Sequence, residues 1–142
     1  MALHLAELWE GVWIRPDNLD PQRFPTPRAV LDQQCTHFHG AATDITADKV
    51  RSLFSLDAWT DDASALIEVM NVELKPSKRD DSTESFRYES ALSIAVVRHL
   101  QLDPLPPVQF IGDHWPGHTL HSTYHRFDHA FKQRMNSAFR RA

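Results

Sequence analysis

The residues best suited to chemistry are four histidines near the carboxyl end of this 142-residue chain. His118, His121, His125 and His129 are spaced three, four and four positions apart. On an α-helix, which turns by about 100° per residue, these side chains fall within about 80° of one face. The apolar residues of the segment cluster about 130° away, on the face expected to join a core: Leu120, Tyr124, Phe127, Phe131, Met135 and Ala138. The pattern predicts a helix over about 118–141 whose histidines lie on a flank that faces solvent, another helix or a partner. A purely structural role, as partly exposed residues that contact the acidic rest of the chain, is one explanation for them.

Metal binding is one hypothesis for this flank. Two histidines four positions apart can hold one Zn²⁺, so His121 and His125, or His125 and His129, could chelate an ion with His118 nearby. A Zn or Fe site of this kind could lower the pKa of a bound water and support hydrolysis. The chain lacks the glutamate of the metalloprotease pattern HExxH and the Glu-x-x-His spacing of di-iron bundles. No cofactor is therefore predicted, and the metal-dependent hydrolase is kept as the alternative.

Basic and aromatic residues beside the histidines suggest a binding surface. Arg126, Lys132 and Arg140 lie on or next to the histidine arc, and Trp115 just before the helix is expected to be an exposed contact residue. Residues 115–142 carry five Lys or Arg and one Asp, although the chain has a net charge of −4. Because the rest of the chain is acidic, a protein partner is favoured, and nucleic-acid or phosphate binding is the second alternative.

A second group of ligating residue types lies near the end of a predicted helix over 26–39. His37 and His39 would share one face if this segment were a strand, but the sequence signals for helix capping favour a helix. Both imidazoles would then lie at the negative end of the helix dipole. Cys35 is expected to be a buried apolar filler rather than a nucleophile, on a stripe with two hydrophobic neighbours: Leu31 and Phe38.

The elements that would hold these residues are mostly helical. Apolar spacings of three and four, with capping residues, predict six helices: about 2–13, 26–39, 46–54, 60–74, 83–102 and 118–141. Two segments also tolerate β-structure, and a short strand is expected in a third: 66–74 and 91–100, and 108–111. Irregular proline-rich connections are expected on either side of the middle helices: 14–26 and 103–117.

Length and composition bound the class of protein. Hydrophobic residues make up 42% and charged residues 24%, which is typical of a folded domain. We expect a single compact domain over 1–142, all-α or α-rich α+β, with five to six helices. The single cysteine excludes an intramolecular disulfide, and neither a signal peptide nor a membrane-spanning stretch is expected. The absence of a catalytic motif favours a small cytoplasmic, non-enzymatic binding or accessory protein that contacts another protein.

Overall fold

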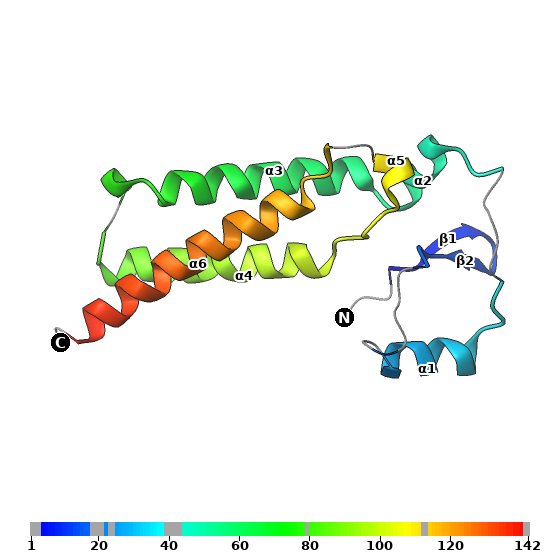
Figure 1. Ribbon diagram of the computed structural model, residues 1–142, viewed down its shortest axis with the longest axis horizontal. Helices are drawn as coiled ribbons and strands as arrows, with labels where there is room; N and C mark the ends of the chain where they lie inside the picture. The colour runs from blue at the N-terminus through cyan, green and yellow to red at the C-terminus, as the bar shows by residue number, and fades with distance from the viewer. Residues whose placement is uncertain are drawn as a thin grey trace. The chain divides into compact units, whose positions relative to one another are not determined.

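A computed structural model describes residues 4–17, 22, 25–38, 44–78, 80–111 and 114–140. These residues form six α-helices, one 3₁₀ helix and a two-stranded antiparallel sheet (Figure 1), so the α-rich fold class is confirmed. The chain forms two compact units. The N-terminal unit comprises Met1–Asp57 and Pro104–Asp113, and the bundle unit comprises Ala58–Asp103 and His114–Ala142. The expectation of one domain over the whole length stays a prediction.

The N-terminal unit begins with a β-hairpin where a helix over 2–13 was expected, so that prediction is wrong. Strand β1 (Ala6–Trp9) pairs with β2 (Val12–Ile14), and Glu7 lies opposite Trp13. Gly11 has a φ of 77°, a left-handed conformation that suits a tight turn and not a helix interior. Its N–H donates to Glu7 Oε1 at 3.1 Å. The aromatic and β-branched residues around this turn favour strands, and their spacing also imitates a helical stripe.

Helix α1 (Pro25–Gln34) is shorter than the predicted helix over 26–39. Only Leu31 of this helix is buried. Cys35 is exposed and Phe38 is 91% exposed, so the expected stripe of buried residues does not form. The stripe was predicted from helical spacing, but the described residues after Gln34 are not helical, so Cys35 and Phe38 do not fall on the same face as Leu31. His37 Nδ1 lies 3.3 Å from Asp32 Oδ1. His39 lies outside the described residues.

The N-terminal unit also contains α2 (Ala47–Leu53) and α5 (Val108–Ile111), and α2 packs against both β1 and α5. The predicted start of α2 is confirmed, because the Thr46 side chain accepts a hydrogen bond from the Lys49 N–H. The strand expected over 108–111 is wrong. Phe110 donates its backbone N–H to the Pro107 carbonyl at 2.9 Å, which closes a helical turn. Proline at the start of such a turn is already set to a helical φ.

Three long helices make up most of the bundle unit, which includes α3 from Ala58 onward: α3 (Leu56–Glu73), α4 (Thr83–Gln101) and α6 (Gly117–Phe139). The short 3₁₀ helix η1 (Pro76–Lys78) follows α3. Residues 66–73 and 91–100 are helical, which excludes the strand alternative there. Helix α3 begins at Leu56, four residues before the expected start, directly after Ser55 with its left-handed φ of 50°.

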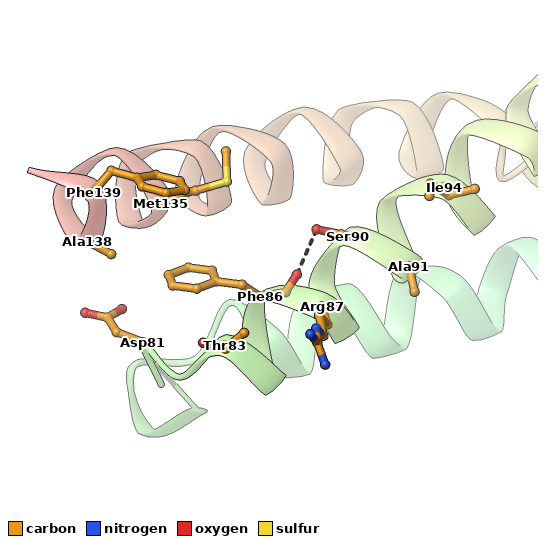
Figure 2. Close-up of a pocket in the computed structure, with 10 residues that line it drawn as sticks. All are labelled: Asp81, Thr83, Phe86, Arg87, Ser90, Ala91, Ile94, Met135, Ala138 and Phe139. Carbon is orange, nitrogen blue, oxygen red and sulfur yellow. Dashed lines mark hydrogen bonds between the residues drawn. The ribbon is translucent and has the colours of Figure 1, made fainter. Parts of the chain in front are cut away.

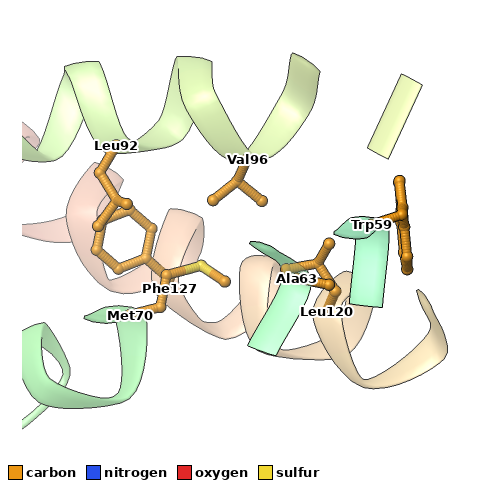
Figure 3. Packing of buried hydrophobic residues seen from close by; sticks show 7 residues of the cluster. All are labelled: Trp59, Ala63, Met70, Leu92, Val96, Leu120 and Phe127. Atoms are coloured by element: carbon orange, nitrogen blue, oxygen red, sulfur yellow. The ribbon is translucent and has the colours of Figure 1, made fainter. Parts of the chain in front are cut away.

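The core of the bundle unit lies where its three long helices meet (Figure 3). Its members come from all three helices and are buried to 8% exposure or less: Trp59, Ala63, Met70, Leu92, Val96, Leu120 and Phe127. Helix α6 crosses α3 and α4 in Figure 1 and packs closely along α4. This core fixes the rotation of α6, and therefore decides which of its side chains reach solvent. In the described part of the chain, no helix is long and apolar enough to cross a membrane.

Candidate functional site

The histidine flank of α6 lies off the core face, as the helical spacing indicated, and of the environments considered for it the structure gives solvent. His118, His121, His125 and His129 all lie at the surface, whereas Leu120, Phe127 and Phe131 on the opposite arc are buried. Within the described ranges, no group of three or more His, Cys, Asp or Glu side chains is placed to hold a metal ion. The four histidines are therefore not gathered into one ligand set. At most, the rings of two histidines that are adjacent on the helix face could bind one ion together.

The basic residues of the predicted binding surface have partners inside the bundle unit. Arg126 Nη2 donates to Asn71 Oδ1 of α3 at 3.2 Å. Lys132 Nζ donates to Asp128 Oδ2 at 2.7 Å, and this hydrogen bond raises the pKa of Lys132. Arg140 is exposed at the end of α6. Asp128 neutralises the charge of Lys132, whereas Arg126, whose partner is a neutral amide, and Arg140 keep their positive charges.

Trp115 is half-buried and not the exposed contact residue that the sequence suggested. Its ring stacks on Trp59 with centroids 4.6 Å apart and an angle of 12° between the ring planes. Its indole Nε1 lies 3.5 Å from Asp103 Oδ2. The short connection before α6 therefore folds this ring onto the core, where offset aromatic stacking is favourable.

Gly117 allows this close packing at the start of α6. A Cβ atom there would lie 2.6 Å from Asp103 Oδ2 and 2.7 Å from Trp115 Nε1, which is closer than van der Waals contact permits. The buried Asp103 carboxylate thus lies at the first residue of the helix, near the positive end of the helix dipole. Because glycine has no side chain, the first residue of α6 can lie this close to Asp103 and Trp115.

A groove between α4 and α6 is the site that the sequence did not predict (Figure 2). Its volume is about 640 Å³, within the range typical of binding pockets. Its walls are mainly apolar side chains from the two helices: Phe86, Ala91, Ile94, Met135, Ala138 and Phe139. Ile94 is 56% exposed and Phe139 is 74% exposed. The groove therefore presents apolar surface directly to solvent.

The apolar stripe of α6 was the one sequence signal for this groove. Met135 and Ala138 were predicted to be core residues, because they continue the spacing of Phe127 and Phe131. The structure leaves both of them half-buried along the groove. The stripe thus extends beyond the buried core, and its last turns form a wall of the groove.

Polar groups at one end of the groove converge on Arg134. Its Nη1 donates to Glu89 Oε1 at 2.6 Å, and its Nε lies 3.4 Å from Asp81 Oδ1. It also donates to the backbone carbonyl of Asp80. Burial alone would lower the pKa of Arg134, but the hydrogen bonds that it donates to Glu89 and Asp81, together with their negative charges, outweigh this effect and raise the pKa. Glu89 is only 1% exposed, so this guanidinium neutralises a buried carboxylate.

The same cluster, which touches the groove through Asp81, holds more carboxylates than guanidinium groups. Hydrogen bonds from the Ser82 hydroxyl and backbone N–H, with the nearby charge of Arg134, lower the pKa of Asp80. Asp81 and Glu89 thus contact the Arg134 guanidinium through their carboxylates, whereas Asp80 contacts it through its backbone carbonyl. The guanidinium of Arg87, which also lines the groove, points away from α6 in Figure 2.

Comparisons with known proteins place the fold and leave the activity open. No protein-family model and no curated protein sequence matches the chain. Among solved structures, the chain is similar to the uncharacterized protein Rv0674 from Mycobacterium tuberculosis, with 28% sequence identity and a TM-score of 0.65. The similarity covers 95% of this chain and 51% of that protein, so the chain spans about half of its length.

Proposed function

We propose that this chain is a non-enzymatic binding protein whose groove between α4 and α6 receives an amphipathic helix of a partner protein. The observation that carries this proposal is the open apolar groove itself. Ile94 and Phe139 leave more than half of their surfaces in contact with water. Covering each of them with an apolar partner would contribute about 1 kcal/mol or more, on the basis of about 25 cal/mol per Å².

The shape of the groove favours a helix as the occupant. Its walls are two neighbouring helices, and the apolar side chains follow their length at helical spacing. An amphipathic helix that lies in such a groove inserts apolar residues at positions i, i+3 or i+4, and i+7. Apolar walls with few polar groups also suit binding better than catalysis, which needs converging polar groups.

The charge at the end of the groove favours a basic partner. Asp80, Asp81 and Glu89 are three carboxylates against two guanidinium groups, on Arg134 and on Arg87, which leaves an excess of negative charge. A Lys or Arg near one end of the partner helix would complement this charge and set the direction of binding. The proposed occupant is therefore a cationic amphipathic helix.

A direct test uses two labelled model peptides with the same helical leucine pattern, one with lysines and one with glutamates as polar residues. Fluorescence anisotropy would give the dissociation constants. We expect tighter binding of the lysine peptide, and a loss of about tenfold (about 1.4 kcal/mol) in Ile94→Asn or Phe139→Ser. Leu102→Asn is the matched control, because Leu102 is 59% exposed on the bundle unit and does not line the groove. Equal affinity of Ile94→Asn and Leu102→Asn would contradict the proposal.

A second test identifies the natural occupant by its position. A photo-crosslinking amino acid would replace Phe139 in one variant and Leu102 in another, in the cells that make the protein. We expect a discrete protein adduct only at position 139, and its loss when Ile94→Asn is added. An adduct with twice the mass of the chain would show that a second copy fills the groove, and would overturn the assignment to a partner protein.

A further inference from the structure

We propose that His121 and His125 form a separate binding site for a borderline divalent metal ion, with two protein ligands. This inference concerns the exposed flank of α6 and is independent of the groove. The sequence alone left two adjacent histidine pairs equivalent, His121 with His125 and His125 with His129. The side-chain contacts of the structure distinguish between them.

The rings of His121 and His125 already converge. Their centroids lie 4.6 Å apart, and the ring planes meet at 73° in an edge-to-face arrangement. Both residues are exposed and lie one helical turn apart. A metal ion that binds imidazole nitrogens at about 2.0–2.1 Å needs two rings of this proximity. Two histidines four positions apart on a helix lie on the same face, where one nitrogen of each ring can be directed at a shared ion.

His129 is engaged elsewhere. Its Nε2 lies 3.1 Å from Gln133 Nε2, so the amide donates a hydrogen bond to this ring nitrogen, one turn further along α6. Binding of a metal ion through that nitrogen would break the hydrogen bond. Metal binding by His121 and His125 leaves the hydrogen bond of His129 intact. The structure therefore favours His121 and His125 over His125 and His129.

The nearby cations of α6 are held away from the pair. Arg126, which follows His125 directly, reaches Asn71 on α3 at 3.2 Å. Lys132 binds Asp128 at 2.7 Å, so its charge is neutralised within the helix. The electrostatic cost of bringing a divalent ion to the exposed pair is consequently reduced.

The ligands define the class of ion. Two neutral imidazoles without a carboxylate favour Cu²⁺, Ni²⁺ and Zn²⁺ over Mg²⁺ and Ca²⁺, which prefer oxygen ligands. By the general order of stability, Cu²⁺ should bind most tightly, with Ni²⁺ and Zn²⁺ weaker. Water completes the coordination shell, so the ion would keep open positions for a further donor.

Isothermal titration of the untagged full chain with CuCl₂, NiCl₂, ZnCl₂ and MgCl₂, in a non-coordinating buffer, tests this site. We expect His121→Ala and His125→Ala each to weaken Cu²⁺ binding by about tenfold or more, because even residues that only orient a ligand cost 10–100-fold. His129→Ala is the matched control, with a change of less than about threefold. Far-ultraviolet circular dichroism verifies that each variant keeps its helices.

The outcomes separate this proposal from its alternatives and from the groove. Loss of binding in His129→Ala together with unchanged binding in His121→Ala would assign the metal to the second pair and overturn the proposal. Wild-type affinity in both His121→Ala and His125→Ala would exclude a site on this flank. Ile94→Asn should bind Cu²⁺ like the wild type. The metal titration therefore tests the histidine pair even if the groove proves not to bind a partner helix.

Discussion

The two units of the molecule differ in how they bury hydrophobic side chains. In the bundle unit, seven buried residues from three helices form one continuous core. The buried hydrophobic residues of the described N-terminal unit are fewer and mostly smaller: Ala6, Leu31, Val50 and Leu56. Large residues of that unit remain in water instead, with Trp9 61% exposed and Trp13 56% exposed. The difference teaches that the intrinsic stability of the chain resides mainly in the bundle.

The largest expected effect comes from removing a core ring of the bundle. Phe127 is 2% exposed, so Phe127→Ala should lower the free energy of unfolding by about 3–5 kcal/mol through lost burial and a new cavity. Trp13→Ala removes a larger but exposed ring and should cost less than about 1 kcal/mol. Chemical denaturation followed by circular dichroism would measure both. Equal losses would mean that the N-terminal unit contributes as much stability as the bundle.

A smaller effect is expected from the buried carboxylate of α4. Glu89→Ala leaves the Arg134 guanidinium without its 2.6 Å partner in a largely buried setting and should cost about 3 kcal/mol. Glu68→Ala, at an exposed position of α3, is the control and should change stability by less than about 0.5 kcal/mol. Thermal unfolding measures the difference. Similar melting temperatures for the two variants would show that the Glu89–Arg134 pair does not stabilise the bundle.

The smallest effect concerns Asp80 and depends on pH. The folded chain lowers the pKa of Asp80 below its ordinary value of 3.8, mainly through the Ser82 hydrogen bonds. This group therefore stabilises the fold above its ordinary pKa, and the contribution disappears as the pH falls through the lower, folded value. Asp80→Asn should melt below the wild type at pH 7, and the difference should disappear as the pH falls below the folded pKa of Asp80.

The control for this pH dependence is Asp62→Asn, which removes the same charge from an exposed position on α3. Its difference from the wild type should not follow the same pH profile. A difference between Asp80→Asn and the wild type that stays constant from pH 7 into the range well below the ordinary pKa of 3.8 would show that the Asp80 charge does not contribute to folding.

The bundle helices could be predicted from the sequence because burial and helical spacing agree there. The apolar stripe of α6 identified Leu120 and Phe127 as core, and the histidines opposite them as exposed. The hairpin could not be predicted in this way. The spacing of Leu5, Trp9 and Val12 resembles one helical face, and only the left-handed turn at Gly11 shows the true structure. The spacing of apolar residues predicts the secondary structure reliably only where those residues are buried in a core.

The candidate groove shows the complementary limit of sequence reasoning. Met135 and Ala138 were identified as apolar residues of α6, but whether another helix covers them depends on where α3 ends and how α4 and α6 pack. Ile94 of α4 and Phe139 of α6 lie 45 residues apart in the sequence and line opposite ends of the groove in Figure 2, so the groove exists only through the packing of the two helices. The convergence of His121 and His125, by contrast, follows from a spacing of four within one helix.

The four tryptophans divide into two optically different pairs. Trp59 and Trp115 stack within the bundle unit, so their excited states couple and should produce a paired positive and negative band in circular dichroism. Trp9 and Trp13 lie in water, where iodide can quench their fluorescence. Quenchable emission therefore reports on the hairpin, and the coupled band reports on the bundle. The fluorescence quenching and the circular dichroism band of the unmodified chain can thus show which of the two units unfolds first.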